Sequence, residues 1–184
     1  FGKKNIIHFQ VPFKKIINPR NLNFVKFKLI NKFVYNSKFT QGVLEKNLPK
    51  KGVVIYPPID TKGFKPNKAK ENIILAVGRF DSPSHAKRQD ILIEAFGKLN
   101  QETNGKYKLI LAGGLRGSDR ELLSLKSRAR NLPIEFKVSP SFKELVSLYA
   151  KAKIFWHAAG FSVNEQENPD KVELFAILEG RAAI

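Results

Sequence analysis

Three cationic side chains cluster in one short segment of the chain, Gly78 to Arg88 (GRFDSPSHAKR). Arg79 comes directly after a short apolar run, and Lys87 and Arg88 stand directly before a stretch whose apolar residues repeat with helical spacing. The first N–H groups of a helix have no partner within the helix and attract anions. Together these groups could clamp a diphosphate, whereas a solvated basic loop would have the same composition.

A second candidate is a loop of small residues, Gly113 to Ser118 (GGLRGS), which also follows an apolar run. Its spacing matches neither the Walker A phosphate loop nor the dinucleotide fingerprint. Gly113 and Gly114 could let a nucleotide lie flat against the backbone, or they could simply form a turn. Both glycines are therefore candidate nucleotide contacts.

The third candidate is the longest loop, Ala158 to Lys171. Trp156 and His157 stand at the tip of the apolar run before it, where they could line a pocket or belong to the core. The loop is acidic, but the spacing of its carboxylates (Glu165, Glu167 and Asp170) fits no metal-ligand motif. We therefore expect no metal site.

Short apolar runs alternate with longer amphipathic ones after Lys70. Such alternation implies parallel strands joined by right-handed crossovers, and so an α/β fold with a doubly wound parallel sheet. Ligands of such sheets bind at the carboxyl ends of the strands, which is where the three candidate loops lie. Ser141 and Glu144 are spaced as a capping box. The expected strands are 72–77, 107–112, 134–138 and 154–157, and the expected helices are 89–99, 119–131 and 141–150.

Residues 1–56 show the same pattern on a smaller scale and are interpreted as the C-terminal part of another α/β domain. Its expected strands are 6–9, 34–36 and 53–56, and its expected helices are 21–32 and 37–46. Residues 57–70 (PPIDTKGFKPNKAK) begin with two prolines, which favour extended backbone, and are predicted to be an interdomain linker. Residues 71–184 are then predicted to be a second domain, itself truncated.

The net charge of +17 is concentrated at one end, since residues 1–70 hold 16 Lys and Arg against two acidic residues. An anionic membrane face, a nucleic acid or no specific partner would each fit this charge. No nucleic-acid recognition motif accompanies it, so nucleic acid is not the partner we expect. Cysteine is absent, which excludes disulfides and thiolate chemistry. No apolar run is long enough to span a bilayer, and no signal peptide opens the chain, so we expect a cytoplasmic protein, at most peripheral at the cytoplasmic membrane face.

Five motifs in series resemble those of family-4 GT-B glycosyltransferases, the glycosyl transferases group 1. An acidic loop and the segment from Glu173 to Ile177 (ELFAI) then stand where such enzymes carry E-H-F-G-I. The motifs are YNSKFTQ (35–41), VVIYPPID (53–60), VGRF with KRQDILIEAF (77–96), LILAGG (109–114) and ELVSLYAKAKIFWHAAGF (144–161). The resemblance implies that residues 71–184 are the Rossmann-like, nucleotide-sugar-binding half of a GT-B fold.

The resemblance also implies an activity. Such enzymes of polysaccharide biosynthesis transfer a hexose such as mannose or glucose, with retention and without a metal, from a GDP-sugar or UDP-sugar donor to a glycan or lipid-linked acceptor. No further cofactor is implied. Arg79 and Lys87 match residues that hold the donor diphosphate and stabilise the leaving group.

Three further site assignments come from the resemblance alone. Glu173 matches a residue that contacts hydroxyls of the donor sugar. The backbone after it faces the phosphates, and His8 matches a histidine near the sugar. The residues of that backbone are Leu174, Phe175, Ala176 and Ile177.

The last part of the chain departs from the family pattern. Leu174 and Ala176 replace the usual histidine and glycine, and Arg181 stands eight positions after Glu173, where a ribose-binding glutamate is expected. Either the chain is an incomplete piece of an active enzyme, or it is a catalytically inactive GT-B-derived domain. A basic nucleic-acid-binding module is the third alternative.

Overall fold

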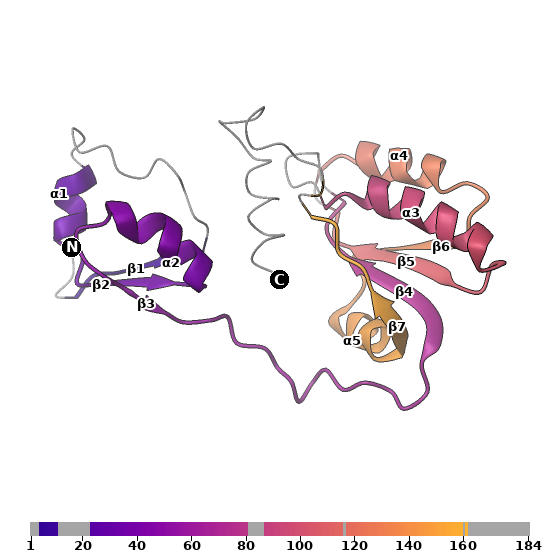
Figure 1. Ribbon diagram of the computed structural model, residues 1–184, viewed down its shortest axis with the longest axis horizontal. Coiled ribbons are helices and arrows are strands. Elements are labelled where there is room, and N and C mark those ends of the chain that lie inside the picture. Colours follow the sequence, from indigo (N-terminus) through magenta and orange to yellow (C-terminus); the bar gives the residue numbers. More distant parts are fainter. Residues whose placement is uncertain (1–3, 11–22, 81–86, 116, 160, 162–184) are drawn as a thin grey trace. The chain divides into compact units, whose positions relative to one another are not determined.

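The computed structural model describes residues 4–10, 23–80, 87–115, 117–159 and 161. The chain divides into two compact units, residues 1–59 and 60–184 (Figure 1). Phe64, in the segment predicted to be a linker, packs edge-on against Phe142 and Tyr149, so part of that segment belongs to the second unit. The assignment of the two units to particular domains stays a prediction.

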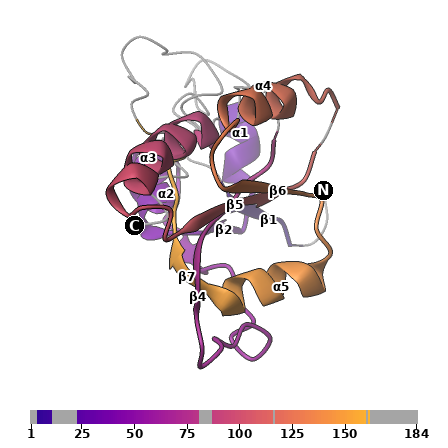
Figure 2. The same cartoon turned by 90° about the vertical axis from the view of Figure 1, so that its right-hand side faces the viewer.

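The second unit is built on a four-stranded parallel sheet in the order β6-β5-β4-β7. Helices α3 and α4 cover one face, and helix α5 covers the other (Figure 2). The predicted doubly wound α/β sheet is therefore confirmed. The strands are β4 (Glu71–Val77), β5 (Lys108–Gly113), β6 (Ile134–Val138) and β7 (Ala152–Phe155), and the helices are α3 (Gln89–Glu102), α4 (Arg120–Arg128) and α5 (Phe142–Lys151).

Two apolar layers hold this sheet between its helices. Successive residues of a strand point to opposite faces, so β4 and β5 contribute buried side chains to both layers. On the face of α3 and α4 the buried core includes Ile74, Phe96, Leu109, Leu111 and Leu125. On the face of α5 it consists of Ile73, Leu75, Ile110 and Ala112, with Leu148 and Tyr149 against them.

The first unit contains a three-stranded parallel sheet in the order β1-β2-β3. Its core is largely aromatic, and the parallel sheet with its helices has the predicted α/β pattern. The elements are β1 (Ile6–Phe9), α1 (Asn23–Lys28), β2 (Lys32–Tyr35), α2 (Lys38–Leu44), the 3₁₀ helix η1 (Glu45–Asn47) and β3 (Val53–Val54), and the core residues are Phe9, Ile30, Phe33, Tyr35 and Leu44.

Several element boundaries differ from those predicted. The helix predicted over 21–32 ends at Lys28, because Asn31 and Lys32 both donate their N–H groups to the Asn5 carbonyl, which places Lys32 in β2. Helix α4 ends at Arg128 rather than near residue 131, and β7 lies two residues before the predicted 154–157. Strand β3 covers only two of the four residues predicted over 53–56.

Helix starts were predicted better than helix ends. The capping box is confirmed, since Ser141 Oγ accepts from Glu144 N at 3.3 Å and Glu144 Oε2 accepts from Ser141 N at 2.8 Å. Asp119 is the N-cap of α4 as predicted, but its side chain makes no capping hydrogen bond, and Ser118 Oγ accepts from Arg120 N instead. Within the described part of the chain, no helix is long and apolar enough to cross a membrane.

Candidate functional site

The loops that leave β4 and β5 lie side by side at the carboxyl end of the second unit's sheet. Gly78 N donates to Ala112 O at 2.9 Å, and Phe80 N donates to Gly114 O at 2.9 Å. A Cβ atom on Gly113 would lie only 1.9 Å from Gly78 O, so only glycine fits there. A Cβ atom on Gly114 would meet nothing within 4 Å. Gly113 therefore serves the contact between the two loops, and Gly114 leaves backbone open beside it.

Lys87 packs its aliphatic stem over Gly78. A Cβ atom built on Gly78 would lie 2.9 Å from Lys87 Cγ and 3.1 Å from Lys87 Cβ, so this glycine makes room for the lysine. The φ angle of Gly78 is not positive, so this close approach, and not a left-handed turn, requires a glycine here. Arg79 follows directly, and both cationic side chains are half-buried. Lys87 thus packs against the residue that directly precedes Arg79.

Gln89 is a site residue that the sequence did not single out. It is buried, and its Nε2 donates to Arg79 O at 3.0 Å and to Gly78 O at 3.4 Å. These hydrogen bonds fix the backbone that carries Arg79. A signal was present, because Gln89 begins the buried stripe of α3, which continues with Leu92, Ile93 and Phe96. A polar residue in an apolar stripe usually has a specific hydrogen-bond partner.

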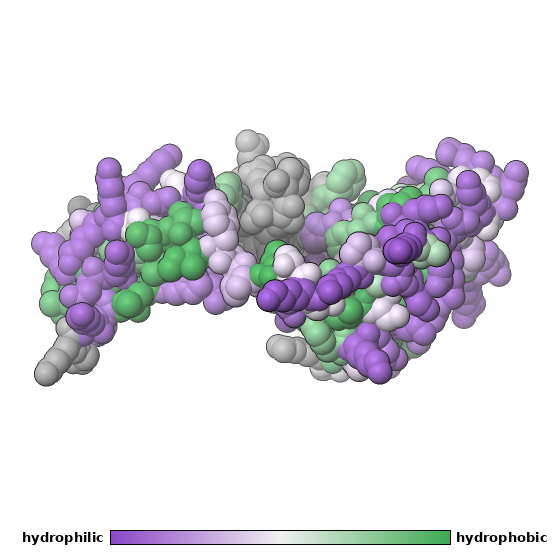
Figure 3. Space-filling model, turned by 90° about the horizontal axis from the view of Figure 1, so that it is seen from below, coloured by the Kyte–Doolittle hydropathy of each residue, from purple (hydrophilic) through white to green (hydrophobic). Residues whose placement is uncertain are grey.

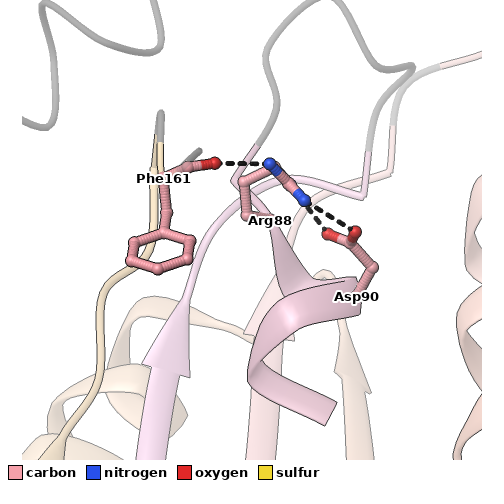
Figure 4. Close-up of polar contacts among 3 residues, drawn as sticks. All are labelled: Arg88, Asp90 and Phe161. Carbon is pink, nitrogen blue, oxygen red and sulfur yellow. Dashed lines mark hydrogen bonds and ion pairs between the residues drawn. The ribbon is translucent and has the colours of Figure 1, made fainter. Parts of the chain in front are cut away.

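The third cation of the predicted clamp has a different role. Arg88 Nε lies 3.1 Å from Asp90 Oδ1, and Arg88 Nη2 lies 3.2 Å from Asp90 Oδ2 (Figure 4). Burial would raise the pKa of Asp90, but the hydrogen bonds and the charge of Arg88 outweigh it and hold that pKa below its usual value. The charge of Arg88 is thus paired within the chain.

A narrow pocket opens at these strand ends. Trp156 and His157, which the sequence placed at a strand tip, line it together with Gly78, Lys87 and Gln89. Its free volume is about 10 Å³, which suits about one water molecule. A nucleotide is far larger, so a bound nucleotide would have to lie over the loops rather than inside this pocket.

The remaining predicted site residues are not among the described residues of the second unit. Glu173 and the following residues, 174–177, lie outside the described part of the chain. His8 lies on β1 in the first unit, where it is exposed and pairs in register with Val34. Their roles stay predictions. Among the described residues, no group of three or more His, Asp or Glu side chains could hold a metal ion.

Comparisons with known proteins point to one family. Residues 59–167 match the family model of the glycosyl transferases group 1. Over 118 residues the chain is 34% identical to the GDP-Man:Man(3)GlcNAc(2)-PP-Dol alpha-1,2-mannosyltransferase of Xenopus laevis, a match that covers 56% of this chain and 24% of that protein. The mannosyltransferase of the same name from Mus musculus is 31% identical over 120 residues, with the same shares. The chain thus spans about a quarter of the length of these relatives.

Solved structures agree on the fold. The crystal structure of TarM has a TM-score of 0.60 at 14% identity, and the match covers 84% of this chain and 32% of TarM. A mutant of S. aureus TarM in complex with fondaparinux, alpha-GlcNAc-glycerol and UDP gives 0.61 at 12% identity, with the same shares. The second unit is therefore the Rossmann-like half of a GT-B fold. Because the family model covers more than half of the chain, including the strands and loops of the site, the chain belongs to the glycosyl transferases group 1.

Proposed function

We propose that this chain is the donor-binding part of a hexosyltransferase that uses a nucleotide-diphosphate sugar. The observation that carries the proposal is the packing of Lys87 against Gly78, the residue before Arg79, beside the open backbone of Gly114 at the carboxyl end of the sheet. Ligands of doubly wound sheets bind at this edge. Membership of the glycosyl transferases group 1 supports the same role.

The chemistry that suits this arrangement is stabilisation of a leaving diphosphate. When the glycosidic bond to the donor breaks, negative charge grows on the nucleotide diphosphate, and preorganised cations stabilise that charge. Arg79 and Lys87 would do this without a metal or any further cofactor. We propose a retaining transfer of the family-4 type, with Glu173 and His8 near the donor sugar and residues 174–177 near the phosphates.

The donor and acceptor follow from the relatives by analogy. The Xenopus laevis and Mus musculus proteins are named for GDP-mannose and a dolichol-linked glycan, and the TarM complex contains UDP. We propose mannose transfer from a GDP-sugar to a glycan or lipid-linked acceptor, in polysaccharide or related glycan biosynthesis. A UDP-sugar such as UDP-glucose is the second candidate donor.

Donor binding can be measured directly on this chain. Isothermal titration calorimetry with GDP-mannose, UDP-glucose and UDP-N-acetylglucosamine should detect binding of at least one donor, and the affinity should not change when EDTA is added. Absence of heat from all three would contradict the proposal. Binding that EDTA abolishes would contradict only the metal-independent part. Donor binding without transfer to any lipid-linked glycan would favour the catalytically inactive alternative.

The first unit offers a surface for an anionic membrane. Ile6, Val25 and Leu29 are between 54% and 64% exposed, and Lys26 and Lys28 stand among them in the chain. Figure 3 shows further hydrophobic surface bordered by hydrophilic surface on the sheet side of this unit, at the left of the view, away from α1 (Figure 1). Apolar side chains that enter the headgroup region, together with lysines that attract anionic lipids, make a peripheral contact. We propose that this contact places the enzyme at the cytoplasmic face of the membrane that carries the acceptor.

Vesicle binding distinguishes the membrane from a nucleic acid. The chain should sediment with vesicles of phosphatidylcholine containing about a third phosphatidylserine but not with pure phosphatidylcholine, and binding should fall as salt screens the charges. Lys26→Glu should weaken binding, whereas Lys98→Glu, on the surface of α3, is the matched control. Binding to RNA or duplex DNA that is tighter than binding to these vesicles at the same salt would favour the nucleic-acid-binding alternative.

A further inference from the structure

Arg88 occupies a position that its residue type does not suit. It is the N-cap of α3 and has a left-handed backbone, with φ 53° and ψ 42°. Glycine adopts this region readily, whereas the Cβ atom of other residues is crowded there. Helix N-caps favour side chains that accept from the first turn, and the Arg88 side chain makes no capping hydrogen bond. Neither the backbone conformation nor the cap accounts for an arginine here.

The contacts of the Arg88 side chain explain why an arginine stands here, because this side chain joins two segments that are 73 positions apart in the sequence. One edge of the guanidinium forms two hydrogen bonds with the Asp90 carboxylate, and Nη1 donates to Phe161 O (Figure 4). The planar guanidinium fork suits this double pairing, and lysine could not reproduce it. The side chain of Arg88 is 20% exposed and that of Asp90 is 31% exposed, so solvent weakens the ion pair only in part.

The segment that Arg88 holds lies just beyond the end of a strand. Pairing between β7 and β4 finishes at Trp156, whose N–H donates to Leu75 O at 2.9 Å. Phe161 N then donates to Ala158 O at 3.0 Å, which forms a turn. Ala158 and Trp156 line the same narrow pocket as Lys87. The contact to Phe161 therefore ties this turn to the start of α3, immediately beside the lysine of the site.

We propose that Arg88 is a positioning residue for the donor site. Through Phe161 it holds Ala158 near the N-terminus of α3, so that Ala158 and Lys87, which line the same pocket, keep a fixed spacing when a nucleoside diphosphate binds. The proposal rests on the proposed function. It assigns to Arg88 no contact with the donor, because its guanidinium is already bonded within the chain.

Arg88→Gly tests this role without adding backbone strain. Glycine suits the left-handed conformation, so the variant should keep its unfolding temperature while losing the contact to Phe161. The exchange of the Phe161 amide hydrogen should become roughly fivefold faster or more, as expected for loss of one hydrogen bond that closes the segment. Calorimetry with GDP and with UDP should show an affinity that is roughly tenfold lower, because the residues after β7 would no longer be held in position beside Lys87.

Two further variants separate positioning from general stability. Asn104→Gly relieves the same kind of left-handed backbone, with φ 50°, at the far end of α3 and should change neither amide exchange at Phe161 nor nucleotide binding. Asp90→Asn removes the charge that orients the guanidinium and should shift both readouts in the same direction as Arg88→Gly, but less. Arg88→Lys should restore neither readout fully.

Each outcome decides the proposal. If the amide hydrogen of Phe161 exchanges at the same rate in Arg88→Gly as in the unaltered chain, the contact between Arg88 and Phe161 does not hold the segment. Faster exchange with unchanged GDP and UDP affinity would overturn the role in donor binding and leave a structural contact. If the unaltered chain binds neither GDP nor UDP, the proposed function fails and this role fails with it. The exchange comparison still distinguishes that case, because it needs no nucleotide.

Discussion

Lys87→Met should weaken binding of GDP or UDP by about 10- to 100-fold, as expected for loss of a charge-assisted hydrogen bond to a phosphate. Methionine keeps the aliphatic stem that packs over Gly78, where Lys87 Cγ comes within 2.9 Å of the position of a Cβ atom. The packing at the strand ends should therefore survive while the charge is lost. Calorimetry with each nucleoside diphosphate measures the loss, and the unfolding temperature verifies that the variant remains folded.

A matched control removes the same charge from the surface of the helix that follows Lys87. Lys98 lies on the exposed surface of α3, where its Nζ is 3.5 Å from Glu94 Oε1 and its side chain is 75% exposed. Lys98→Met should leave the affinity for GDP and UDP unchanged. An equal loss in both variants would mean that net charge alone attracts the nucleotide, which would contradict a specific clamp.

Arg79→Met should reduce the affinity in the same direction, because Arg79 directly follows the glycine that Lys87 packs against, and both cations would contact one diphosphate. Since they act on the same group, their losses should not add fully in the double variant. If the losses in binding free energy of the two single variants add fully in the double variant, Arg79 and Lys87 do not act on the same diphosphate.

The sheet of the second unit could be predicted from the sequence because its two central strands, β4 and β5, are buried on both faces and are therefore continuous apolar runs. The edge strand β6 alternates apolar and charged residues, and it was predicted with its observed bounds. The bounds of β7 were harder to predict, because the apolar run continues into Trp156 although the strand ends at Phe155. Hydrophobicity marks burial, whereas the end of a strand is set by its hydrogen-bonded neighbour.

The short helix of the first unit shows a similar limit. Its apolar spacing continues to Ile30, but the hydrogen bonds from Asn31 and Lys32 to the carbonyl of Asn5 turn the chain into β2. That partner lies 26 positions away from Asn31, and no local pattern reveals it. Contacts between distant segments therefore set the boundaries that local periodicity leaves open.

The candidate site was predictable in its location but not in its pairings. The rule that ligands bind at the carboxyl ends of parallel strands located the loops of Arg79, Lys87 and Gly114. The sequence could not show that Arg88 pairs with Asp90 and Phe161, because a carbonyl acceptor carries no sequence signal. Composition alone does not distinguish the cations of one loop. The structure shows that Arg88 bonds to Asp90 and to the carbonyl of Phe161.

Gly113→Ala should destabilise the second unit by about 3 kcal/mol, at the upper end of what overpacking usually costs. The added Cβ atom would lie 1.9 Å from Gly78 O and 2.6 Å from Gly78 C, which are backbone atoms that no rotamer change can move. To relieve this clash, the ends of β4 and β5 would have to separate. The hydrogen bonds from Gly78 N to Ala112 O and from Phe80 N to Gly114 O would then lengthen or break.

Urea unfolding monitored by the fluorescence of Trp156 measures this loss, since the tryptophan belongs to the second unit. Gly114→Ala is the matched control, because a Cβ atom there would meet nothing within 4 Å and the unfolding midpoint should not change. If both variants unfold at the same urea concentration as the unaltered chain, the close contact between the two loops is wrong. A stable Gly114→Ala variant that binds GDP or UDP more weakly would instead place the nucleotide against the Gly114 backbone, because the added methyl group could then act only on the ligand.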